Sequence, residues 1–280
     1  MSLRSILLVL DDAPSCADRT RFAIRLAKAH GARLVGLAPM GSADFPIAVD
    51  GAASIFEYAE IAWRAVRERA ERGAQSFREA CEDEAMEFAA VVDESAQVVS
   101  ILKHAHSADL VVVGQADRAA ANPALARQLV EDVVTTGSRP TLVVPEAGRI
   151  EASPRTALVA WDGSRQADRA LLDALPLLHR CDAVWLEAWS ETDDDASSLR
   201  SRLQAVCDWL ARHEVRASPS CEGRRAGATL AEAIRSRAAE RGADLIVMGA
   251  YGRSRWSERI LGGTTRGLLD TMTVPLLMSH

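Results

Sequence analysis

The sequence predicts an α/β protein made of two tandem five-stranded parallel-sheet domains. Short apolar runs alternate along the chain with longer segments of helical periodicity, which is the pattern of parallel sheets with helical crossovers. Some runs, such as Ser5–Leu10 (SILLVL), are apolar throughout, as in strands covered on both faces. The pattern also occurs twice. Residues 107–114 (SADLVVVG) align with 242–249 (GADLIVMG), and 139–144 align with 273–278, so the chain is a tandem duplication.

In the first half, five apolar runs predict strands at residues 5–10, 33–38, 86–92, 109–114 and 140–145. Helical periodicity between them predicts helices at 15–30, 55–84, 97–106 and 125–136. Residues 39–54 are rich in Gly, Pro and Ala and are predicted to form a loop. The polar segment 146–154 is predicted to be the linker, which gives domains at 1–147 and 154–280.

The second half restarts the same order after the linker. Strands are predicted at residues 155–161, 183–189, 215–218, 244–248 and 274–278. Helices are predicted at residues 165–179, 197–213, 229–241 and 258–272, with an acidic segment at 191–195 before the second of them. Ligands of such sheets bind beyond the carboxyl ends of the strands, where Asp11, Gly114, Asp162 and Gly249 are predicted to lie.

Composition restricts the function classes. The 280 residues are 48% hydrophobic and carry a net charge of −6, which argues against non-specific nucleic-acid binding. No run approaches the roughly 18 apolar residues of a membrane span. The apolar run near the N-terminus is predicted to be a strand and not a secretory signal, so a cytoplasmic protein is expected. The five cysteines include no CxxC spacing, and no metal site is predicted.

A glycine-rich stretch at 249–265 (GAYGRSRWSERILGGTT) follows a predicted strand and precedes a predicted helix. This geometry lets backbone N–H groups face a phosphate, and glycine permits close approach of a ligand. The first half keeps Gly114 but continues with Gln-Ala-Asp117 and has no further glycine until Gly137. The negative charge of Asp117 would repel phosphate, so we expect no nucleotide in the first half.

Four features together identify the chain as similar to the universal stress protein family. They are a first strand ending in Asp in each half, the ADLIVMG segment, the G-x2-G-x9-G spacing and the closing VPLLM strand. The resemblance covers nearly the whole chain, twice. It implies an adenine nucleotide α-hydrolase-like (Rossmann-like) fold in each half, frequent dimers, and ATP or AMP binding, with or without Mg²⁺, in members that keep the glycine motif.

The resemblance also implies where the ligand lies. Asp162 matches the family's acid near the adenine and ribose, and Ala160 and Trp161 match backbone that faces the base. Gly263 stands where the family's nucleotide binders usually have Ser or Thr. The alternative role for Asp162 is to cap the turn at Gly163. The implied binding residues are Ala160, Trp161, Asp162, Leu186, Ala188, Met248, Gly249, Gly252, Arg253, Gly262, Gly263, Thr264 and Thr265.

The leading hypothesis is a stress-response protein that binds an adenine nucleotide in its C-terminal half for regulation. A Walker lysine is absent and no catalytic residues are predicted, although a slow ATPase is left open. The alternative is a scaffold without nucleotide that acts through dimerisation and partner surfaces. A receiver-like domain is disfavoured because no Lys follows Val144. Edge strands are natural pairing surfaces, so the strands containing Pro140 and Pro275 are expected to pair within one chain, and a homodimer is a further option.

Overall fold

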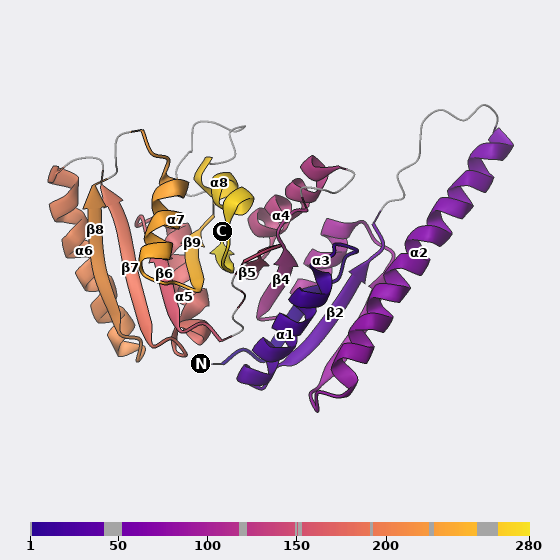
Figure 1. Cartoon of the computed structure of the whole chain (residues 1–280), viewed down its shortest axis with the longest axis horizontal. Helices are drawn as coiled ribbons and strands as arrows, with labels where there is room; N and C mark the ends of the chain where they lie inside the picture. Colours follow the sequence, from indigo (N-terminus) through magenta and orange to yellow (C-terminus); the bar gives the residue numbers. More distant parts are fainter. Residues whose placement is uncertain are drawn as a thin grey trace.

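One sheet of ten strands runs through the computed structural model, in the order β3-β2-β1-β4-β5-β10-β9-β6-β7-β8 (Figure 1). The structure describes residues 2–41, 52–117, 122–148, 150, 153–190, 193–223, 227–250 and 263–280. Within these ranges every neighbouring pair of strands is parallel except β5 and β10, which pair antiparallel at the centre. Each half therefore contributes a five-stranded parallel sheet, as the sequence predicts.

The element bounds follow the alternating pattern. The strands are β1 (Ser5–Val9), β2 (Arg33–Pro39), β3 (Phe88–Asp93), β4 (Leu110–Gly114), β5 (Thr141–Val144), β6 (Thr156–Ala160), β7 (Ala183–Ser190), β8 (Ala217–Gly223), β9 (Leu245–Gly249) and β10 (Leu276–Ser279). The helices are α1 (Cys16–His30), α2 (Ala52–Glu82), α3 (Gln97–Ala105), α4 (Pro123–Thr136), α5 (Arg165–Leu178), α6 (Asp193–Arg212), α7 (Leu230–Glu240) and α8 (Gly263–Thr271).

Most predicted bounds differ from the structure by a few residues, and β8 and α6 differ enough to need an explanation. Strand β8 runs on to Gly223, whereas the sequence predicted residues 215–218. As an edge strand, β8 accommodates Pro219 and exposed polar residues, which the apolar pattern could not reveal. Helix α6 begins at Asp193 and includes aspartates assigned to the preceding segment, because acidic residues are favoured in the first turn of a helix. Residues 42–51 of the predicted loop and 258–262 of the last predicted helix lie outside the described residues.

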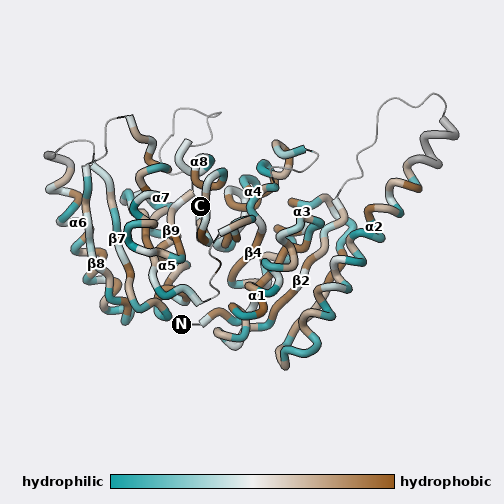
Figure 2. The backbone as a smooth tube through the Cα atoms, in the orientation of Figure 1, coloured by the Kyte–Doolittle hydropathy of each residue, from teal (hydrophilic) through white to brown (hydrophobic). Residues whose placement is uncertain are grey.

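The helices divide into two layers on the two faces of the sheet. Helices α1, α2, α5 and α6 pack on one face, where the cluster of buried residues includes Leu8, Val112 and Leu277. Helices α3, α4, α7 and α8 pack on the other face, where it includes Leu7, Val111 and Leu276. Neighbouring strand residues thus alternate between two buried faces, and Figure 2 shows the resulting hydrophobic colour along β2 and β4. No described helix is both long enough and apolar enough to cross a membrane.

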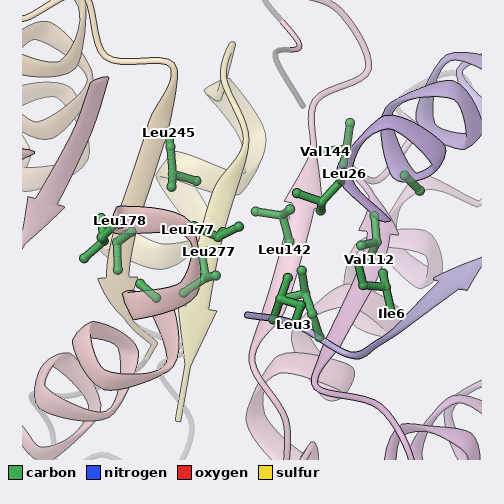
Figure 3. Packing of buried hydrophobic residues seen from close by; sticks show 14 of the residues in the cluster. Leu3, Ile6, Leu26, Val112, Leu142, Val144, Leu177, Leu178, Leu245 and Leu277 are labelled. Atoms are coloured by element: carbon green, nitrogen blue, oxygen red, sulfur yellow. The ribbon is translucent and has the colours of Figure 1, made fainter. Parts of the chain in front are cut away.

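The two halves meet through β5 and β10, the strands that the sequence analysis expects to pair. Leu276 pairs with Val143, Leu277 with Leu142, and Met278 with Thr141. Leu142 and Leu277 are 1% and 0% exposed, and both belong to the cluster shown in Figure 3. The hydrophobic core is therefore continuous from one half of the chain to the other.

The last residue of α1, His30, is buried and should make stability depend on pH. Neither ring nitrogen has a hydrogen-bond partner in the described part of the chain. Burial, and then the positive charge of Arg180, lower the pKa of His30 to about 4 from the usual value of 6.5. The folded protein therefore keeps this ring neutral at pH values where the unfolded chain already binds a proton.

We expect the folded protein to lose about 1–2 kcal/mol through His30 as the pH falls from 7.5 to 5. The loss begins as the pH drops through the unfolded pKa and ends near the folded pKa, because only the unfolded state gains the proton in that window. Urea unfolding of the wild type and of His30→Leu at both pH values measures this effect. An equal pH dependence in the two proteins would contradict the assignment.

Candidate functional site

The carboxyl ends of β6 and β9 lie side by side in the second half. Ala160, the last residue of β6, pairs with Met248 near the end of β9, and also with Glu187 of β7. Asp162 lies two residues after Ala160, and Gly249 directly follows Met248. The structure thus brings Ala160, Asp162, Met248 and Gly249 to one edge of the sheet, which is where parallel α/β sheets bind ligands.

Asp162 shapes the turn that leads from β6 into α5. Its carboxylate oxygen Oδ1 accepts the backbone N–H of Ser164 at 2.9 Å. The hydroxyl of Ser164 in turn accepts the N–H of Ala167 at 3.2 Å and caps α5. Asp162 therefore has the turn-capping role that the sequence allows, at the same strand end where the family resemblance places a ligand-binding acid.

Trp161 is held from three sides. Its backbone N–H donates to the carbonyl of Glu187 at 2.9 Å, and its indole N–H donates to Asp168 at 2.8 Å. The guanidinium carbon of Arg202 lies 5.0 Å from the ring centroid, a cation–π contact. Arg202, on α6, is thus a cation beside the candidate site that the sequence did not predict. Its distance in sequence from any motif left no signal for it.

Three of the implied binding residues, on β7 and β9, have buried side chains. Leu186 and Ala188 are both 0% exposed and pack in the cluster on the α5–α6 face. Met248 is also buried and packs on the opposite face of the sheet. These side chains are therefore part of the hydrophobic core on the two faces of the sheet and are not exposed to solvent.

Gly249 permits close packing between β9 and α5. A Cβ atom at this position would lie 2.5 Å from the backbone nitrogen of Ala167, closer than any side chain can approach. A glycine is therefore required here by the packing of the first turn of α5, whatever binds nearby.

Helix α8 begins at Gly263 with the predicted phosphate-facing residues in its first turn. Gly263 is exposed, and among the residues that the structure describes a Cβ atom added there would meet nothing within 4 Å. Thr264 is half-buried, whereas Thr265 is 2% exposed. The first N–H groups of a helix have no partner inside the helix and carry partial positive charge, which suits an anion. Gly252, Arg253 and Gly262 lie outside the described residues.

In the first half, an arginine lies at the carboxyl ends of β1 and β4, the strands that correspond to β6 and β9. Arg19 of α1 is 1% exposed, and its Nη2 atom lies 2.7 Å from Asp11 and 3.4 Å from the carbonyl of Val9. A Cβ atom on Gly114 would lie 2.0 Å from Nη1 of Arg19. The guanidinium thus packs against the ends of β1 and β4. Asp11, whose side chain is 39% exposed, is the carboxylate that pairs with this buried cation.

The described residues contain no group of three or more His, Cys, Asp or Glu side chains arranged to hold a metal ion. What the second half offers instead is a helix N-terminus, a strand-end carboxylate and a nearby guanidinium. A helix N-terminus and a guanidinium attract negative charge, whereas a carboxylate accepts hydrogen bonds from hydroxyl and N–H groups.

Comparison with known proteins gives a consistent picture. The model of the universal stress protein family matches residues 2–145 and again 154–280. A universal stress protein from Archaeoglobus fulgidus DSM 4304 is similar in structure, with a TM-score of 0.75 and 19% identity, over 98% of this chain and 95% of that one. A functionally unknown protein from Pseudomonas aeruginosa PAO1 gives a TM-score of 0.61 and 16% identity, over 99% and 92% of the two chains. No curated protein matches the sequence.

Proposed function

Because this chain belongs to the universal stress protein family and contains the family's domain twice, we propose that it is a regulatory stress-response protein that binds an adenine nucleotide in its C-terminal repeat. The ligand is ATP or AMP, with or without Mg²⁺. The repeats span residues 1–147 and 154–280, and their pairing within one chain takes the place of a dimer of single repeats. The protein acts in the cytoplasm.

The contrast between the two repeats supports this proposal most directly. In the first repeat, a protein guanidinium packs against Gly114 and pairs with Asp11. In the second repeat, the helix that follows the glycine stretch begins at Gly263, where an added Cβ atom would meet none of the described residues within 4 Å. Asp162 stands at the neighbouring strand end. The first repeat thus places a buried guanidinium at its strand ends, whereas the second repeat places the first turn of α8, with its partial positive charge, after the glycine stretch.

Calorimetric titration with ATP and AMP tests the proposal on the wild type and on Gly263→Asp. A Cβ atom at residue 263 would clash with none of the described residues, and an acid in the first turn favours the helix, so the variant should fold at least as stably. Its carboxylate would nevertheless repel phosphate. We expect about one site per chain in the wild type and none in the variant. A wild type that shows no binding at millimolar ATP would refute the proposal.

Gly263→Ser should strengthen ATP binding by about five- to tenfold. The substitution restores the hydroxyl that the family's nucleotide binders usually carry at this position, and no described residue lies close enough to an added Cβ atom to obstruct it. Gly263→Ala is the matched control, since it adds the Cβ atom without the hydroxyl. Equal affinities for the Ser and Ala variants would show that no phosphate lies within reach of residue 263.

The scaffold hypothesis is the second candidate, and helix α2 supports it. This helix is 31 residues long, and its N-terminal end extends away from the sheet (Figure 1). Along its length Ile61 and Trp63 are 59% and 36% exposed. If ATP and AMP both fail to bind, this helix is the first surface to test for partners.

A further inference from the structure

Helix α8, which follows the glycine stretch of the second repeat, forms ion pairs with helix α4 of the first repeat. Arg266 pairs with Glu131 of α4 at 3.2 Å, and Asp270 pairs with Arg127 of α4 at 3.0 Å. Because the first residues of one helix meet later residues of the other, α4 and α8 run antiparallel. Side chains of one repeat therefore set the position of a helix in the other.

A third contact comes from the altered loop of the first repeat. Gln115 directly follows Gly114, where the glycine motif has been lost. Its amide donates to the carbonyl of Leu269 in α8 at 2.7 Å, and its amide oxygen accepts the N–H of Glu146 at 3.0 Å. The first repeat thus uses this loop to hold α8.

The ion pair at Glu131 lies close to the candidate phosphate position. Arg266 is in the first turn of α8, three residues after Gly263. Glu131 is 4% exposed, so its carboxylate is a fixed and buried partner and not a mobile surface charge. Arg266 is 43% exposed, so the pair is buried on one side only, and a charge-assisted hydrogen bond to a fixed carboxylate still restricts geometry more than a fully exposed pair does.

We propose that Glu131 of the first repeat is a positioning residue for nucleotide binding in the second repeat. By holding Arg266, it orients the first turn of α8 so that the N–H groups converge on the phosphates. This inference rests on the proposed function, because it specifies how that same site is preorganised. It also assigns a role to the repeat that has lost its own glycine motif.

The sign of one substitution separates positioning from simple electrostatics. Glu131→Gln removes a negative charge, and Coulomb attraction alone would then make the site bind anionic ATP more tightly. Loss of positioning has the opposite effect, because the first turn of α8 is no longer held. Asp132→Asn is the matched control: it removes the same charge one residue away, on a half-buried side chain, whereas the ion pairs found between α4 and the described residues of α8 involve Arg127 and Glu131.

The affinity for ATP is measured by calorimetry for the wild type and both variants, at a temperature well below their unfolding midpoints. We expect Glu131→Gln to weaken binding by about three- to thirtyfold without changing the stoichiometry. Asp132→Asn should leave the affinity within about twofold of the wild type or tighten it. Unchanged or tighter binding in Glu131→Gln, even with a lower unfolding midpoint, would overturn the inference and leave Glu131 a structural residue only.

The double variant Glu131→Gln/Arg266→Gln tests whether Arg266 acts through Glu131. If Arg266 only transmits the position of α4, its replacement adds little once Glu131 has been replaced. If Arg266 instead contacts the phosphate, Arg266→Gln weakens binding by the same factor in both backgrounds. That additive result would also overturn the inference.

Amide hydrogen exchange in the absence of nucleotide keeps this inference distinct from the proposed function. The amides of Gly267 to Thr271 donate to the carbonyls of the preceding turn in an α-helix, so they report how well that turn is held. We expect faster exchange there in Glu131→Gln than in Asp132→Asn. Equal exchange rates in the two variants would show that Glu131 does not hold the first turn of α8. If the wild type fails to bind ATP but exchange is faster in Glu131→Gln, the proposed nucleotide binding is refuted, whereas the role of Glu131 in holding α8 is supported.

Discussion

Replacing Asp11 by alanine should lower the free energy of unfolding by about 3 kcal/mol. Arg19 is 1% exposed and spans the ends of β1 and β4, so its guanidinium has little access to water. Asp11, 39% exposed, is the carboxylate paired with it, at 2.7 Å. Removing one partner of a buried ion pair leaves the other charge uncompensated. The partial exposure of Asp11 places the expected loss at the low end of the range for such pairs.

The effect should depend on Arg19. Urea unfolding of Asp11→Ala in the wild-type and Arg19→Met backgrounds measures this dependence. In the Arg19→Met background we expect a loss of only about 1 kcal/mol, which reflects the hydrogen bond that Asp11 accepts from the N–H of Ala13. Asp11→Asn keeps an acceptor for that hydrogen bond, so in the wild-type background its loss of unfolding free energy should be smaller than that of Asp11→Ala. Equal losses in both backgrounds would show that the ion pair contributes nothing to stability.

The Arg19 case illustrates what a sequence leaves hidden. Strand and helix order could be predicted, because residues such as Leu7 and Leu8 face two buried layers and produce apolar runs with no alternation. Helical periodicity also placed α1, but it treats an arginine as a surface residue. Whether a long side chain turns inward depends on the carboxylate and glycine that it meets. Here these are Asp11 and Gly114, which belong to different strands.

In the candidate site, too, some features could be predicted from the sequence and others could not. The positions of Asp162 and Gly249 at strand ends could be predicted, because apolar segments come just before them, whereas Gly263 was predicted to lie inside a helix starting at residue 258. The contact of Arg202 with Trp161 joins residues of different elements that no local pattern connects. The anchor between Glu131 and Arg266 crosses between repeats for the same reason. Local patterns therefore predict where backbone groups lie, whereas side-chain partners over long distances require the tertiary structure.

Leu277→Ala should lower the free energy of unfolding by about 3 kcal/mol, because it opens a cavity where the two repeats join. Leu277 is fully buried and pairs in register with Leu142 across the antiparallel junction. The two side chains belong to one cluster, and Figure 3 shows them on the neighbouring strands. A cavity at this place should weaken both repeats together, because the core is continuous through the junction.

A double-mutant cycle with Leu142→Ala measures how far the junction couples the repeats. We expect the two losses to deviate from additivity by about 1 kcal/mol, as for other residues in contact. Leu186→Ala is the matched control. It removes an equally buried leucine from β7, away from the junction, and its effect should add to that of Leu142→Ala.

Unfolding of Leu277→Ala should also remain a single transition when followed by hydrogen exchange in both repeats. If only the C-terminal repeat became less stable, the two repeats would be independent folding units joined by a strand contact. The first repeat could then not act as a firm support for α8.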